Sequence, residues 1–250
     1  IFPVMSESEK DHEGSKAADD EMPLQSTVRD LKEKFGDEIL LMTDACLCTS
    51  TDHGHCGLLE GHNIVNDPSV ETLVGISLSH ARAGTDYVCL SDMMDGRVLS
   101  VRRSFENEGF KSTGIMSYSV KYASSFYGPF REAASSSPSF GDRSSHQMDV
   151  RSDYREAILE AKADVNEGCD ISMVKPGLPY LDVLSEVSSS IERPVAVYNV
   201  SGEYSMVMGY AKDPVQRKRV VLEILGSFSR AGADIIVSYH SREAVREGWV

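Results

Sequence analysis

The feature that most limits the fold of this chain is a set of six short apolar runs, each followed by a polar loop. The runs are EILLMTD (38–44), DYVCLS (86–91), TGIMSYS (113–119), DISMVK (170–175), PVAVYNV (194–200) and DIIVSY (234–239). Their apolar residues are nearly continuous, which is typical of parallel strands that are covered on both faces. The sequence therefore predicts a parallel β-sheet.

Helical patterns lie between these runs, so that predicted strands and helices alternate along the chain. Four helical segments, 69–84, 96–109, 155–168 and 218–232, end on Gly, the residue expected just past a helix. This order predicts the α/β class.

Two α/β architectures fit this order. One is an open doubly wound sheet, and the other is a (β/α)8 TIM barrel that is N-terminally truncated, with Ile1–Val4 as the tail of a further strand. Polar side chains follow at least five of the predicted strands, and a barrel gathers such residues into one mouth. We therefore predict a single barrel domain over residues 1–250, without the N-terminal arm and first strand of a whole barrel.

Charge and composition exclude several classes of partner. The net charge of −14 argues against a broad surface for nucleic acid or an anionic membrane. No apolar run approaches the length of a membrane span. Five cysteines are an odd number in a chain without a disulfide-rich composition, which favours a reducing compartment.

Three of these cysteines, Cys46, Cys48 and Cys56, directly follow the first predicted strand in the stretch CLCTSTDHGHC. A C-x-C pair is too close for an easy disulfide, but both thiolates can face one ion. Zinc prefers such ligands, and a set of three leaves a fourth position open for water or substrate. From this stretch alone, a closed structural site with His53 or His55 as fourth ligand remains equally open, and a disulfide is the minor alternative.

Two lysines stand at or near the ends of predicted strands. Lys175 ends one strand in MVKPGLPYLDV, where an apolar mouth would disfavour its ammonium form. A neutral amine is the nucleophile that forms a Schiff base with a ketone. A lone strand-end lysine more often reaches solvent or pairs with a carboxylate. Lys121 lies in the long aromatic segment SYSVKYASSFYGPFREAA (117–134), which predicts either a lid over the mouth or an ordinary packed loop.

Seven motifs together resemble the 5-aminolevulinate dehydratase family, also called the porphobilinogen synthases. They are TDACLCTSTDHGHCGLL, SDMMDGRV, SYSVKYASSFYGPFREAA, GDR, MVKPGLPYLDV, VSGEYSM and RAGADIIVSY, in order from about Leu40 to Tyr239. The resemblance implies a (β/α)8 barrel that condenses two molecules of 5-aminolevulinate to porphobilinogen, with loss of two waters, in tetrapyrrole and haem biosynthesis. The alternative is a non-catalytic fragment of the same family that keeps the site residues.

The resemblance also implies a role for individual residues. Lys175 matches the lysine that forms a Schiff base with the first-bound substrate, at the P site, and Lys121 and Asp44 match residues that serve the second substrate, at the A site. Cys46, Cys48 and Cys56 match the ligands of the catalytic Zn²⁺ in the zinc-dependent branch. The matching substrate-binding positions are Arg131, Arg143 and Gln147 for the A-site carboxylate, Ser201 and Tyr239 for the P-site carboxylate, and Ser91, Asp92, Tyr127, Phe130 and Tyr198 in the pocket lining.

Metal, assembly and location are further expectations from the resemblance. Glu160 stands where relatives with an allosteric Mg²⁺ have a glutamate, so magnesium is a second expected metal. Ser145 replaces a lid cysteine that helps some animal relatives to hold a second zinc beside the position of His55. Relatives form homo-octamers through the N-terminal arm. The expected location is cytoplasmic, with a plastid as the alternative.

Overall fold

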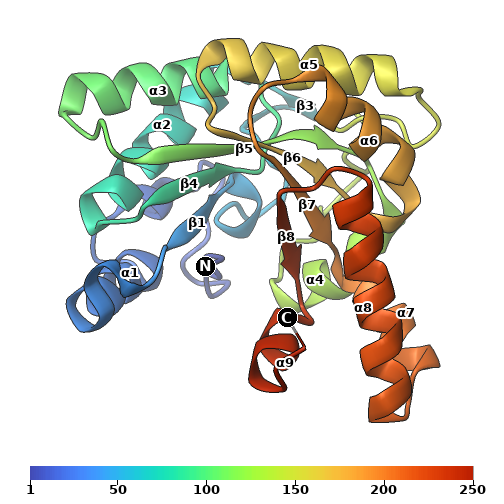
Figure 1. Cartoon of the computed structure of the whole chain (residues 1–250). Coiled ribbons are helices and arrows are strands. Elements are labelled where there is room, and N and C mark those ends of the chain that lie inside the picture. The colour runs from blue at the N-terminus through green and yellow to red at the C-terminus, as the bar shows by residue number, and fades with distance from the viewer. Residues whose placement is uncertain (250) are drawn as a thin grey trace. The chain divides into compact units, whose positions relative to one another are not determined.

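The computed structural model describes residues 1–249, which divide into two compact units that are each described by themselves (Figure 1). The first unit contains Ile1–Tyr118, Ala134–His146 and Asn166–Asp170. The second contains Ser119–Ala133, Gln147–Val165 and the chain from Ile171 onward. The prediction of a single barrel domain over the whole chain stays a prediction.

Parallel strands form the centre of the first unit. They are β1 (Met42–Ala45), β4 (Tyr87–Leu90) and the first part of β5 (Gly114–Lys121), in the order β1-β4-β5. Met42 pairs with Tyr87, and Tyr87 pairs with Gly114, so the three strands are in parallel register. Ile1 N donates to Met42 O at 2.6 Å and Ile1 O accepts from Asp44 N at 2.9 Å, so the chain start lies beside β1, but Ile1–Val4 form no strand, unlike the expected strand tail.

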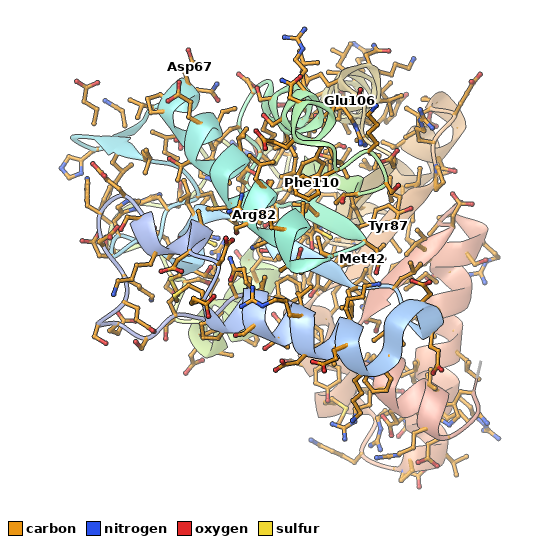
Figure 2. All side chains as sticks on the ribbon, turned by 90° about the vertical axis from the view of Figure 1, so that its left-hand side faces the viewer. Met42, Asp67, Arg82, Tyr87, Glu106 and Phe110 are labelled. Carbon is orange, nitrogen blue, oxygen red and sulfur yellow. The ribbon has the colours of Figure 1, made fainter. Side chains whose placement is uncertain are left out.

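Helices and short elements surround these strands. They are η1 (Ser15–Ala18), α1 (Pro23–Phe35), η2 (Gly36–Glu38), η3 (Leu47–Thr49), the antiparallel pair β2 (Leu59–Glu60) and β3 (Asn63–Ile64), α2 (Asn66–Ala83) and α3 (Arg97–Glu108). Helices α2 and α3 end at Gly84 and Gly109, whose φ angles of 98° and 87° are left-handed, as the sequence predicted. Figure 2 shows α2 from Asp67 to Arg82, with α1 beside its C-terminal end.

Parallel strands are also the core of the second unit. The end of β5, β6 (Ile171–Lys175), β7 (Val195–Asn199) and β8 (Ile235–Ser238) follow in this order. Tyr122 N donates to Lys175 O at 3.0 Å, which places the end of β5 beside the end of β6. Every residue of β6 and β7 is buried, as expected for strands covered on both faces.

The helices of the second unit follow its strands. They are η4 (Ser125–Tyr127), α4 (Gly128–Ala133), α5 (Tyr154–Glu167, whose last two residues belong to the first unit), η5 (Leu178–Tyr180), α6 (Leu181–Ser190), α7 (Ser201–Tyr210), α8 (Pro214–Arg230) and α9 (Ser241–Arg246). Asp213 caps α8 by accepting a hydrogen bond from Gln216 N at 2.8 Å, and Pro214 occupies the first helical position.

The alternation of parallel strands and helices confirms the predicted α/β class. Within residues 1–249, no helix has the length and apolar character needed to cross a membrane.

Candidate active site

The cysteine cluster lies in the first unit, directly after β1. Cys46, Cys48 and Cys56 are 2 %, 7 % and 0 % exposed, and their sulfur atoms all lie within 4.8 Å of one another. The Sγ atoms of Cys46 and Cys48 are 3.3 Å apart. All three cysteines are free, so the minor alternative of a disulfide is wrong. Three buried soft donors around one point are a donor set that fits Zn²⁺.

A buried arginine lies beside this cluster and helps to lower the pKa of one of its thiols. Arg143 is 5 % exposed, and its guanidinium donates to Gly54 O at 2.8 Å and to Ser136 O at 2.5 Å. Hydrogen bonds with the thiols of Cys46 and Cys48, together with the charge of Arg143, hold the pKa of Cys56 well below its usual value. This shift favours the thiolate form of Cys56, which is the form that metal ligation requires.

The segment Ala134–His146 lies against the cysteine loop. Gly54 has a φ of +69°, and a Cβ atom there would lie 2.4 Å from Ser137 O. Ser139 N donates to His53 O at 3.0 Å, beside that contact. Only glycine allows the two backbones to approach so closely, which explains why the loop needs it.

A second group of potential ligands lies on the outer side of the same loop. His12, Asp52 and His53 also offer three ligand atoms within 4.8 Å. However, both ring nitrogens of His53 are already hydrogen-bonded, one to His12 O at 3.2 Å and the other to His55 N at 3.1 Å. The cysteines are therefore the better metal site.

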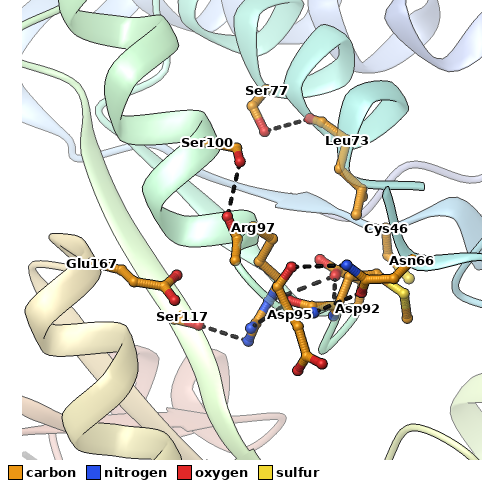
Figure 3. A network of polar contacts seen from close by, with 12 residues as sticks. Cys46, Asn66, Leu73, Ser77, Asp92, Asp95, Arg97, Ser100, Ser117 and Glu167 are labelled. Atoms are coloured by element: carbon orange, nitrogen blue, oxygen red, sulfur yellow. Dashed lines mark hydrogen bonds and ion pairs between the residues drawn. The ribbon is translucent and has the colours of Figure 1, made fainter. Parts of the chain in front are cut away.

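The loop after β4 holds a buried ion pair (Figure 3). Asp92 and Arg97 are 0 % and 1 % exposed, with 3.6 Å between Arg97 Nε and Asp92 Oδ1. Arg97 also donates to Ser117 Oγ at 2.9 Å and to Met94 O at 3.1 Å. Burial raises the pKa of Asp92 to about 6, although Arg97 opposes this shift. Sequence analysis missed Arg97, because a charge at the start of a helix is usually exposed to solvent.

Two other predicted residues of the first unit lie at or just past the ends of strands. Asp44 in β1 is 6 % exposed, and Ser91, just after β4, is 5 % exposed. Ser91 N donates to Ala45 O at 3.2 Å, so the loop after β4 begins beside the residue that precedes Cys46. The first unit therefore brings together Asp44, Ser91, Asp92, the cysteines and Arg143.

The second unit surrounds the amine of Lys175 with aromatic rings. Lys175 Nζ lies 4.4 Å from the ring centre of Tyr198, 5.2 Å from that of Tyr127 and 6.0 Å from that of Phe130. Tyr127 also fixes the strand end, since its hydroxyl donates to Lys175 O at 3.1 Å and to Tyr122 O at 2.8 Å. The three aromatic residues predicted to line the pocket therefore enclose the predicted nucleophile.

Lys121 is the last residue of β5 and is 5 % exposed. Because Tyr122 N bonds to Lys175 O, the two lysines end neighbouring strands. Met148 N donates to Lys121 O at 3.0 Å, which brings the chain at Gln147 to the same strand end. The Gln147 side chain is buried, and neither its oxygen nor its nitrogen has a hydrogen-bond partner in the described part of the chain.

The remaining predicted residues of the second unit are Ser201, Arg131, Tyr239 and Glu160. Ser201 Oγ accepts a hydrogen bond from Phe130 N at 3.1 Å. The guanidinium of Arg131 lies 5.3 Å from the Tyr127 ring centre, and the Tyr239 ring centre lies 6.2 Å from that of Tyr198. Glu160 lies on α5, half-buried, and its magnesium role stays a prediction.

The sequence of this chain is similar to known dehydratases over nearly its whole length. The family model for delta-aminolevulinic acid dehydratase matches residues 1–247. The delta-aminolevulinic acid dehydratase of Bacillus subtilis is 47 % identical over 239 residues, which are 95 % of this chain and 73 % of that protein. Its counterpart in Methanothermobacter thermautotrophicus is 52 % identical over 232 residues, or 93 % of this chain and 70 % of that protein.

The fold of this chain is also similar to that of a solved structure from the same family. The crystal structure of delta-aminolevulinic acid dehydratase (porphobilinogen synthase) from Toxoplasma gondii, in complex with the reaction product porphobilinogen, matches with a TM-score of 0.95 and 44 % identity. The match covers 98 % of this chain and 70 % of that chain.

Fold and matches together define a hydro-lyase of the TIM-barrel class. The family model covers nearly the whole chain, and the relatives are closely similar over more than nine tenths of it. The chain belongs to the delta-aminolevulinic acid dehydratase family, the porphobilinogen synthases. The predicted fold class, enzyme class and family are confirmed.

Proposed function

We propose that this chain condenses two molecules of 5-aminolevulinate to porphobilinogen through a Schiff base on Lys175. The observation that carries this mechanism is the placement of Lys175 Nζ among the rings of Tyr198, Tyr127 and Phe130. These rings exclude water from the amine, and their faces attract the iminium cation that forms when the amine adds to the substrate ketone and water leaves. The iminium then draws electrons from the neighbouring carbon of the bound substrate.

The hydroxyl groups of Ser201 and Tyr239 would bind the carboxylate of the substrate on Lys175. Ser201 Oγ accepts from Phe130 N at 3.1 Å and donates to Phe126 O at 3.4 Å, and this long bond would be exchanged for one to a carboxylate oxygen when the substrate binds. Burial raises the pKa of Tyr239, which keeps its hydroxyl protonated as a donor. The residues that match the A-site positions keep that role as proposals: Lys121, Asp44, Arg131, Arg143 and Gln147.

We further propose that Cys46, Cys48 and Cys56 hold a catalytic Zn²⁺. The support is that all three thiols are free, buried and close to one another. Bound zinc would supply Lewis-acid polarisation of a substrate carbonyl. Arg143 favours the thiolate form of Cys56 that ligation needs. A Mg²⁺ at Glu160, a homo-octamer of the whole protein and a cytoplasmic (alternatively plastid) location remain proposals that rest on the family resemblance.

One experiment tests the reaction and the metal together. Full-length protein is incubated with 5-aminolevulinate, and porphobilinogen is measured by its colour reaction, with and without a zinc chelator. We expect product only without chelator, and recovery when zinc is added back. Borohydride added during turnover should attach substrate to wild type and not to Lys175→Ala. Substrate attachment that survives in Lys175→Ala would refute the Schiff-base assignment.

A further inference from the structure

A buried carboxylate joins strand ends of the second unit, although no predicted role includes it. Glu203 lies in the first turn of α7 and is 1 % exposed. Its Oε1 accepts from Leu178 N at 2.5 Å, and its Oε2 accepts from Val200 N at 2.5 Å. One side chain therefore connects the loop after β6 with the loop after β7.

The connection continues to the end of β8. Asn199 Nδ2 lies 3.4 Å from Glu203 Oε2 and donates to it. Asn199 Oδ1 in turn accepts from Ser238 Oγ at 2.9 Å, and Ser238 Oγ accepts from His240 N at 3.1 Å. These hydrogen bonds form a continuous chain, here called the Glu203 network, from Leu178 to His240.

The Glu203 network fixes the backbone that carries the proposed P-site residues without including any of them. Lys175 lies three residues before Leu178, and Ser201 lies two residues before Glu203. Tyr239 stands between Ser238 and His240. The network therefore governs the spacing between one amine and two hydroxyl groups.

Helix capping alone does not account for this arrangement. The bond from Val200 N is the capping interaction of α7, but the bonds that reach Leu178 and Asn199 lie outside the helix. A buried carboxylate is costly, and burial raises the pKa of Glu203 against the opposing effect of these hydrogen bonds. A neutral Gln at the same position would complete the capping box of α7 without that cost.

We propose that Glu203 is a positioning residue that sets the spacing between the Lys175 amine and the hydroxyls of Ser201 and Tyr239, so that Lys175 selects ketones that carry a carboxylate. This proposal rests on the proposed function. Its consequence is a loss of selectivity, and not only of rate, when the Glu203 network is broken.

The test compares two amino ketones in the full-length protein. One is 5-aminolevulinate, and the other is aminoacetone, which has the same amino ketone group and no carboxylate chain. Lys175 Nζ adds to either carbonyl with loss of water, cyanoborohydride delivers hydride to the iminium carbon, and a stable secondary amine results. Mass spectrometry gives the rate of attachment for each ketone, and the ratio of the two rates measures selection by the carboxylate.

Glu203→Gln replaces one acceptor oxygen with an NH₂ group that faces a backbone N–H. We expect the attachment rate for 5-aminolevulinate to fall about 10- to 100-fold, as for other small displacements of reacting groups. The rate for aminoacetone should change much less, so the ratio falls. Ser238→Ala removes the link to Asn199 and should lower the ratio by a smaller factor. Glu223→Gln, at an exposed position of α8, is the matched control and should leave both rates unchanged.

A folded Glu203→Gln protein whose two rates fall equally would overturn the proposal, because a general structural defect does not distinguish the ketones. If Glu203→Gln does not fold, Ser238→Ala decides, and an unchanged ratio there overturns the proposal. A wild-type protein that attaches neither ketone refutes the proposed function, and this proposal with it. Wild-type attachment with normal selectivity in Ser238→Ala and Glu203→Gln refutes the positioning role alone.

Discussion

Replacement of Arg97 by Met should destabilise the protein strongly, and the effect should depend on pH. The substitution keeps an unbranched side chain of similar length but removes the charge that faces Asp92 and the donors to Ser117 and Met94. Both charged groups are almost completely buried. Breaking a buried pair by removing one partner costs about 3–5 kcal/mol, since the remaining charge is left without compensation. For a protein of this size, the midpoint of thermal unfolding should fall by roughly 6–20 °C.

The pH dependence separates the charge from lost packing. Burial already raises the pKa of Asp92 to about 6, and without Arg97 that pKa should rise further. At pH 5 the Asp92 carboxyl of Arg97→Met is then protonated in the folded state, so the penalty of a buried charge disappears. The free energy of unfolding of Arg97→Met should therefore fall further below that of wild type at pH 8 than at pH 5. Circular dichroism follows the unfolding at both pH values.

Arg151→Met is the matched control, because Arg151 pairs with Asp149 at the surface, where the side chains are 85 % and 51 % exposed. That change should leave the free energy of unfolding nearly unchanged, because water and salt screen an exposed ion pair. The double variant Asp92→Asn with Arg97→Met should recover part of the loss, since no buried charge remains. The reasoning fails if Arg97→Met costs no more than Arg151→Met, or if its deficit is the same at both pH values.

Three further perturbations test other features. In wild type, the pKa of Asp92 is about 6 in the folded state and about 4 in the unfolded state. The protein is therefore more stable when Asp92 is protonated, and it loses that stability as the pH rises and Asp92 ionises. The free energy of unfolding should fall by about 2 kcal/mol more between pH 4 and pH 7 in wild type than in Asp92→Asn, measured by urea titration. Cys56→Ser should lose bound zinc, measured by atomic emission, while its circular dichroism spectrum stays native; full zinc content would count against the three-cysteine site. Gly54→Ala places a Cβ atom 2.4 Å from Ser137 O at a φ of +69°, and should lower stability by about 1–3 kcal/mol, whereas Gly61→Ala, with φ +64° and no atom within 4 Å, should cost less.

Local pattern was sufficient to predict the strands and the cysteine cluster. The apolar runs are continuous, and C-x-C followed by a third cysteine places three thiols in one short loop. The helix Pro23–Phe35 was not predicted, although Leu24, Val28 and Leu31 have helical spacing and pack with Leu41. Its apolar stripe is narrow and lies between charged residues.

The local sequence pattern could not predict which charged residues are buried. Arg97 and Glu203 both stand in the first turn of a helix, where a charged residue is usually solvated. Their burial depends on which strand ends and loops pack against those turns, and this information lies in residues far along the chain, such as Ser117 for Arg97 and Leu178 for Glu203. Arg97 lies in the motif SDMMDGRV, and Glu203 lies in the motif VSGEYSM. Each motif as a whole therefore indicated the functional region better than the charge of the single residue did.

The close approach of Gly54 to Ser137 has a kinetic consequence. The three cysteines are buried. Arg143 joins the cysteine loop to the segment Ala134–His146, because it donates hydrogen bonds to Gly54 O in the loop and to Ser136 O in the segment. The segment Ala134–His146 and the cysteine loop are therefore held together by one buried side chain and by the close backbone contact at Gly54. Loss of these contacts, as in Gly54→Ala, should let the loop open more often, so the three thiols should react faster with a labelling reagent than in wild type.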